Sequence, residues 1–285
     1  MSEMFDVVRV SVVFAVMIYA SVSDIRSREV TDRCWWILGI LGIGCMIYSA
    51  FAEGMRWEYV LLIIGSVMIL ADILSEVIDN NTVGKIFHVL MALMFLIPLM
   101  YSFDDMIVKQ FFMVFVMFIV FLLMFITGIV KGGADVKCLI VLSMVFTSYP
   151  SLSGFPLIAS PGPMYEMIFQ FSIMVLFFAA LLSMLTMFYV LSVNIRNGDR
   201  QVKKRYMGFM MSIEKARSSY VWPLQFVSDA GIVTTWKAQD PEVLNDLDAA
   251  GAENVLVTPM VPFMVPMTIA ILFLTLIGNP YFLIL

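Results

Sequence analysis

Two aspartates stand where long apolar segments meet short polar ones. Asp24 lies in the polar stretch 23–30 that follows the first apolar segment, and Asp135 lies in residues 131–137 between two later apolar segments. Two carboxyl groups that share a proton can act together, one as general base on a water molecule and the other as general acid on a leaving amine. Peptide-bond hydrolysis needs both roles, so this pair predicts an aspartyl protease at a membrane face.

The composition excludes a soluble domain. Of the 285 residues, 61% are hydrophobic and 14% are charged, and the chain contains 25 Met and 24 Phe. A chain this apolar is typical of an all-α polytopic membrane protein. The net charge of −5 is modest and the basic residues form no patch of the nucleic-acid-binding kind. The expected partner is therefore the lipid bilayer, and no nucleic acid is expected.

Apolar windows divide the chain into about eight transmembrane helices, since about 20 residues cross roughly 30 Å of hydrocarbon. The expected spans are residues 5–22, 34–52, 59–74, 84–101, 106–130, 136–149, 164–193 and 262–284. This pattern predicts three parts. Residues 1–193 hold transmembrane helices 1–7 with both aspartates, residues 194–256 form a small cytosolic α+β subdomain, and residues 257–285 hold the C-terminal transmembrane helix.

The basic residues orient these spans. If the first span ends in the cytosol, all of the 17 Lys and Arg residues except Arg9, Arg56 and Lys109 fall in cytosolic segments, as the positive-inside rule requires. Four spans separate Asp24 from Asp135, and an even number returns the chain to the same face. The topology therefore predicts that both acids lie at the cytosolic face of the membrane.

Both acid segments resemble those of one protease family. Asp24, followed by Arg-Ser-Arg-Glu-Val at residues 26–30, resembles the first catalytic segment of type IV prepilin peptidases. The sequence Gly132-Gly133-Ala134-Asp135 resembles the G-x-G-D segment that these enzymes share with presenilin-type proteases. The archaeal preflagellin and prepilin peptidases are the most similar branch, also in residues 257–266. Two departures are Ala134 at the second Gly position and a longer interval between the acids.

The resemblance implies an aspartic endopeptidase in the cell membrane that removes a short basic leader peptide from preflagellin or type IV prepilin precursors at the cytosolic face. Asp24 and Asp135 would be the catalytic pair, and Gly132, Gly133 and Lys137 would shape the site. No metal ion or other cofactor is expected. The four-cysteine segments of many bacterial members are absent from the sequence, so no methyltransferase activity is inferred.

A second group of acids lies at the predicted cytosolic end of the third span. Asp72, Glu76 and Asp79 are four and three residues apart, which would place them on one helical face. One interpretation of these acids is a cation site. The more common explanation is a polar helix face, which here could recognise a basic substrate segment, so Glu76 and Asp79 are candidates for leader recognition. His88 is interpreted as a core or interface histidine.

Two other functions remain open. An ion- or proton-coupled transporter could use the intramembrane acids as carriers, although they cluster at one face and no inverted repeat is visible in the sequence. A presenilin-like protease could cut within a transmembrane segment, although Ser23 stands before Asp24 where a Tyr is expected.

The polar region is expected to contain both strands and a helix. Residues 222–227 and 231–236 flank a short turn and predict a strand pair. Asp240, Pro241 and Glu242 form a helix start, and Gly251 would end that helix.

Overall fold

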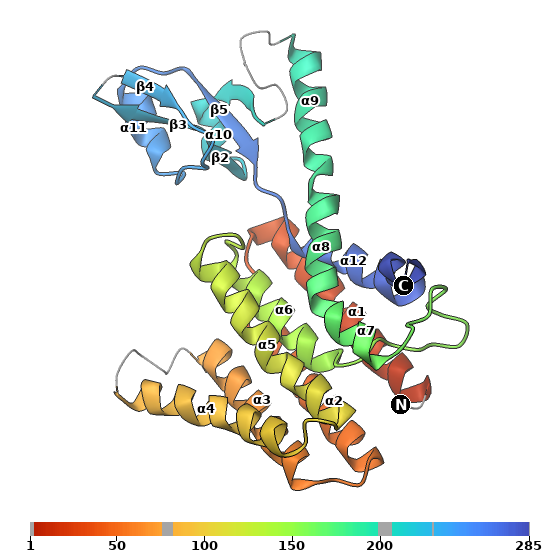
Figure 1. The fold of residues 1–285 in the computed structure, drawn as a ribbon. Coiled ribbons are helices and arrows are strands. Elements are labelled where there is room, and N and C mark those ends of the chain that lie inside the picture. The colour runs from red at the N-terminus through yellow and green to blue at the C-terminus, as the bar shows by residue number, and fades with distance from the viewer. Residues whose placement is uncertain (1–2, 76–81, 199–206, 230, 285) are drawn as a thin grey trace. The chain divides into compact units, whose positions relative to one another are not determined.

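The computed structural model describes residues 3–75, 82–198, 207–229 and 231–284 (Figure 1). Most of these residues are helical, and a small sheet region occurs between residues 209 and 259. The chain divides into two compact units. The first comprises Met1–Ala179 and Pro262–Leu285, and the second comprises Ala180–Val261. The second unit contains the predicted subdomain 194–256 with further residues on both sides.

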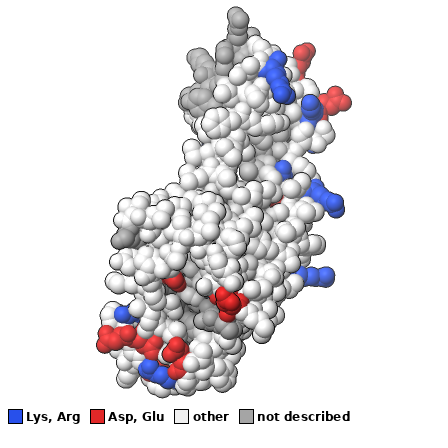
Figure 2. Space-filling view, turned by 90° about the vertical axis from the view of Figure 1, so that its right-hand side faces the viewer, with Lys and Arg blue, Asp and Glu red and all other residues white. Residues whose placement is uncertain are grey.

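Long apolar helices form most of the first unit. They are α1 (Glu3–Ser27), α2 (Arg33–Ala52), α3 (Trp57–Ser75), α4 (Thr82–Tyr101) and α5 (Met106–Ile126). With the stretch Phe171–Asn197, which contains α8 (Phe171–Ser183) and α9 (Leu185–Asn197), they make 6 described helices long and apolar enough to cross a membrane. Much of the surface seen in Figure 2 is accordingly uncharged. The chain thus has the helices of a polytopic membrane protein.

Two predicted spans are shorter as helices than the sequence suggests. Residues 136–149 contribute only to α6 (Gly133–Val145), and residues 262–284 form α12 (Met264–Leu276) and the 3-10 helix η1 (Pro280–Leu283). Both α-helices have 13 residues, which is about 20 Å at 1.5 Å per residue, against roughly 30 Å of hydrocarbon. The total of about eight spans stays a prediction.

Helix α6 is the core helix of the first unit. It packs against α2, α3 and α5, and every residue from Cys138 to Val145 is buried. A helix that is apolar all round belongs in an interior. Gly42 of α2 permits the closest approach, because a Cβ there would lie 2.7 Å from Met144 Cβ and 2.9 Å from the backbone nitrogen of Val145.

Buried charges satisfy the C-terminal end of α6. The carbonyl of Val145 accepts a hydrogen bond from Arg9 Nη1 at 3.2 Å. Arg9 pairs with Asp6 at 2.6 Å, and Asp6 also accepts from the backbone N–H of Ser151 at 3.0 Å. A buried cation needs such partners, and the negative end of a helix favours one. Arg9, which departs from the positive-inside count, therefore has a structural role.

A second ion-pair group joins α3 and α5 at the same end of the unit as Arg9. Arg56 contacts Glu58 and Asp105, each at 2.6 Å. Asp105 also caps α5, accepting from the N–H groups of Ile107 at 2.8 Å and Val108 at 3.2 Å. Arg56, another exception to the charge count, thus links two helices through one carboxylate.

The described residues of the second unit form two small antiparallel sheets. One has the strand order β1 (Phe209–Ser212), β5 (Asn254–Pro259), β2 (Val221–Pro223), and the other pairs β3 (Gln225–Ser228) with β4 (Gly231–Thr234). The two short helices are α10 (Ile213–Arg217) and α11 (Val243–Ala249).

The local predictions for this region are confirmed in part. The β3–β4 pair matches the second half of the predicted first strand and most of the predicted second strand, with Phe226 opposite Val233. The first half of that first strand was wrong, because Trp222 and Pro223 belong to β2 in the other sheet. Asp240 accepts from the N–H of Glu242 at 3.1 Å just before α11. After the helix, Gly251 adopts a φ of +79°, a left-handed conformation that glycine reaches without strain.

Two glycines of α2 give a matched test of the α2–α6 contact. Gly42→Ala is expected to destabilise the protein by about 1–3 kcal/mol, because its Cβ would collide with the α6 backbone. Gly44 has no atom within 4 Å of its Cβ position, so Gly44→Ala is expected to be neutral or to stabilise by up to about 1 kcal/mol. Thermal unfolding in detergent measures both, and equal midpoints would contradict this packing.

Candidate active site

Helices α1 and α6 are antiparallel neighbours. Arg9 of α1 contacts Val145 at the far end of α6, and Met17, further along α1, lies 3.5 Å from Cys138 near the start of α6. Asp24 is seven residues beyond Met17, and Asp135 is three residues before Cys138. At 1.5 Å per residue these steps are about 10 Å and 5 Å in the same direction. Both acids therefore lie at one end of the helix pair.

Four helices connect the two acids. Helices α2, α3, α4 and α5 separate Asp24 from Asp135, and each is long and apolar enough to cross a membrane. The predicted even number of crossings is consistent with these lengths and with the shared end of α1 and α6.

Asp24 is held at the start of α12. Its Oδ2 atom accepts a hydrogen bond from the backbone N–H of Met264, the first residue of that helix, at 3.1 Å. One turn further in, the hydroxyls of Ser21 and Thr268 are hydrogen-bonded at 2.8 Å. These contacts fix α12 along α1 and orient the Asp24 carboxylate. The charge of Arg28, just beyond the end of α1, also acts on this carboxylate.

Asp135 is the third residue of α6, and its carboxylate folds back over Gly132. A Cβ on Gly132 would lie 2.8 Å from Asp135 Cγ, whereas a Cβ on Gly133 would have no atom within 4 Å. A side chain at position 132 would therefore displace the Asp135 carboxylate, whereas one at position 133 would meet no neighbouring atom. Asp135 is half-buried, and the charge of Asp24 acts on its carboxylate.

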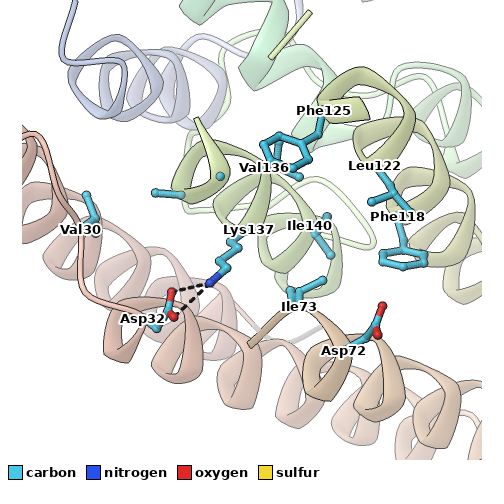
Figure 3. Close-up of a pocket in the computed structure, with 12 residues that line it drawn as sticks. Val30, Asp32, Asp72, Ile73, Phe118, Leu122, Phe125, Val136, Lys137 and Ile140 are labelled. Carbon is cyan, nitrogen blue, oxygen red and sulfur yellow. Dashed lines mark hydrogen bonds and ion pairs between the residues drawn. The ribbon is translucent and has the colours of Figure 1, made fainter. Parts of the chain in front are cut away.

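Lys137 turns away from Asp135 toward the loop before α2. Its Nζ contacts both carboxylate oxygens of Asp32, at 2.9 and 3.0 Å (Figure 3). Asp32 occupies the position before α2 but makes no side-chain cap to that helix; its oxygens bind the lysine instead. Lys137, predicted to shape the site, thus ties the start of α6 to the start of α2.

A cavity of about 500 Å³ lies beside this ion pair. Its walls come from the loop before α2, the C-terminal halves of α3 and α5, and the first two turns of α6. Gly133 and Ala134, the residues just before Asp135, line it. We call this cavity the α5–α6 groove. The other residues that line it are Val30, Asp32, Asp72, Ile73, Phe118, Leu122, Phe125, Val136, Lys137 and Ile140.

The remaining predicted residues have different outcomes. Glu76 and Asp79, the candidates for leader recognition, lie outside the described residues. Asp72 contacts His88 Nε2 at 3.2 and 3.3 Å, so the histidine is a partner of an acid near the end of α3. Across the described parts of the chain, no group of three or more His, Cys, Asp or Glu side chains is placed to hold a metal ion.

Sequence reasoning missed the roles of Asp32 and Met264. The signal for Asp32 was its position, a capping-type residue just before an apolar helix and eight residues after Asp24. The signal for Met264 was the stretch 257–266, which carries part of the family resemblance but has no titratable side chain. A backbone N–H acts there, and side-chain types alone do not reveal it.

Comparison with models of protein families and with curated protein sequences finds no match for this chain.

The packing of α1 on α12 can be tested with a cysteine pair. Ser21→Cys with Thr268→Cys, in a background in which Cys34, Cys45 and Cys138 are replaced by Ala, is expected to form a disulfide under mild oxidation. The two hydroxyl oxygens are 2.8 Å apart, and cysteine is nearly isosteric with serine, so the geometry fits a disulfide.

The control for this pair is Val22→Cys with Thr268→Cys, because Val22 is 42% exposed beside the buried Ser21. Mass spectrometry of proteolytic fragments detects the linkage. Equal linkage in both pairs would contradict the α1–α12 register that holds Asp24 against Met264.

Proposed function

We propose that this chain is a membrane-embedded aspartic endopeptidase, with Asp24 and Asp135 as its catalytic residues. The observation that carries the proposal is the placement of two carboxylates at one end of the antiparallel helices α1 and α6. Such a pair titrates as a unit and can hold one shared proton.

The chemistry follows from one ionised and one protonated carboxyl group. The ionised carboxylate takes a proton from water as the water oxygen attacks the peptide carbonyl carbon, which gives a tetrahedral intermediate. The protonated partner then donates its proton to the amide nitrogen as the C–N bond breaks. One new carboxyl group and one amine result, and the enzyme keeps one proton between the two aspartates.

The site has a scaffold suited to this reaction. Asp24 lies at the N-terminus of α12 and Asp135 in the first turn of α6. Both helix N-termini lie at the same end of α1, and their dipoles favour negative charge there. An intermediate with a developing oxyanion would be stabilised by such a field.

For the substrate, the resemblance of both acid segments to type IV prepilin peptidases supports a precursor of the preflagellin or type IV prepilin class. Such a protein carries a short basic leader followed by an apolar helix. The proposal places the cut at the cytosolic face of the cell membrane, as the distribution of Lys and Arg supports. In this topology Asp24 and Asp135 face the cytosol.

The direct test is cleavage of candidate precursors by membranes that contain the protein. Asp24→Asn and Asp135→Asn are each expected to lower the rate by at least about 100-fold, because each removes one partner in proton transfer. Asp24→Glu and Asp135→Glu are expected to be nearly as damaging, since the added methylene displaces the carboxylate. Mass determination of the mature N-terminus provides the readout, with Glu53→Gln, an exposed acid just after α2, as the control.

Full activity in either Asn variant, with normal protein level in the membrane, would refute the assignment. Loss of activity on chelation, restored by a metal ion, would instead point to metal-dependent chemistry.

Gly132 and Gly133 provide a second test. Gly132→Ala is expected to lower kcat by about 10- to 100-fold, because the new Cβ must displace the Asp135 carboxylate. Gly133→Ala is expected to retain activity, since its Cβ would have no atom within 4 Å. Cleavage rates at saturating precursor compare the two, and equal losses would show that helix geometry, not the carboxylate position, causes the defect.

A further inference from the structure

The α5–α6 groove has an apolar wall with helical spacing. Phe118, Leu122 and Phe125 are four and three residues apart on α5, so they share one face of that helix (Figure 3). Leu122 and Phe125 are 39% and 43% exposed, whereas Phe118 at the inner end is buried. Ile140 of α6 lines the groove as well. A wall of this kind fits the apolar face of a bound helix or extended segment.

Of the two carboxylates that line the groove, only Asp32 has a Lys or Arg partner among the described residues. The charge of Asp32 is balanced by Lys137, which contacts both of its oxygens. Asp72 lies on the opposite wall, and its carboxylate oxygens lie 3.2 and 3.3 Å from Nε2 of His88. Among the described residues, no Lys or Arg side chain forms an ion pair with it. Because the Asp72 side chain is only 17% exposed, an arriving cation would pair with it in a partly desolvated setting.

The groove adjoins the catalytic pair through the backbone. Gly133 and Ala134 line it and directly precede Asp135. A peptide bound along the α5 wall would therefore pass next to Gly133 and Ala134, the two residues before Asp135. The ligand chemistry that this combination fits is an apolar peptide segment that carries one lysine or arginine.

We propose that the α5–α6 groove binds such a segment, with its cation against Asp72 and its apolar side chains against Phe118, Leu122 and Phe125. Asp72 is then a specificity residue that selects a basic segment. The site of cutting rests on the proposed function of Asp24 and Asp135, but binding in the groove does not require turnover. The two ideas can therefore fail separately.

The test measures binding of synthetic peptides to the full chain in lipid nanodiscs, in an Asp24→Asn background that prevents turnover. One fluorescent peptide has a single Lys before an apolar stretch of about 18 residues, and its partner has Gln in place of Lys. Asp72→Asn is expected to weaken binding of the Lys peptide by about tenfold and to leave the Gln peptide unchanged. Glu53→Gln, an exposed acid just beyond the C-terminal end of α2 and outside the groove, is the control and should change neither.

Charge reversal guards against a folding defect. Asp72→Lys is expected to bind the Lys peptide more weakly. It should bind more tightly a third peptide that has Glu in place of the Lys. Leu122→Trp, which fills the groove, should weaken all three peptides, whereas Leu123→Trp on the adjacent exposed position should not. Loss of the Lys and Gln peptides to the same extent in Asp72→Asn would overturn the proposal. So would affinities that do not change, as expected if lipid or a second copy of the chain fills the groove.

Cleavage by the wild-type chain separates the two proposals. Charge-dependent binding without any cleavage of natural or synthetic segments would support the groove and reject the peptidase. Cleavage that depends on Asp24 and Asp135 but not on Asp72 or Leu122 would support the peptidase and reject the groove.

Discussion

Two short helices inside an apolar bundle impose the main constraint on this structure. Helices α6 and α12 have 13 residues each, so their ends leave unpaired backbone groups within an apolar interior, where each would be costly. Charged side chains of α1 satisfy one end of each. Arg9 donates to the last residue of α6, and Asp24 accepts from the first residue of α12. A single long helix therefore aligns both short ones.

This alignment explains the placement of the acids. Because α1 is antiparallel to both α6 and α12, the N-termini of the two short helices lie at the same end of α1. Asp24 is on α1 at that end, and Asp135 is in the first turn of α6. The buried Arg9 and Asp6 pair at the opposite end thus fixes the position of α6 along α1. It thereby also fixes the position of Asp135 along α1.

The sequence was sufficient to predict that Asp24 and Asp135 lie at the same end of the helices that carry them. The acid segments and the even number of long apolar helices predict a shared end, and the helix contacts agree. Helix ends were harder, because hydropathy counts apolar residues without showing where the helix stops. Phe146 and Tyr149 continue the apolar run past the end of α6, and Gly278 interrupts the run after α12. The α5–α6 groove depends on packing among three helices, so no local pattern in the sequence reveals it.

The hydrogen bonds around Asp24 support bond chemistry over transport. A carrier must expose its acid to each side in turn, which requires the helices around that acid to exchange partners. Here Asp24 is tied to Met264, and Ser21 is tied to Thr268 one turn deeper. Moving Asp24 would break both contacts and leave the first N–H of α12 without its partner. Proton transfer to a bound peptide needs the opposite property, a carboxylate held in one orientation, and this arrangement supports the peptidase proposal.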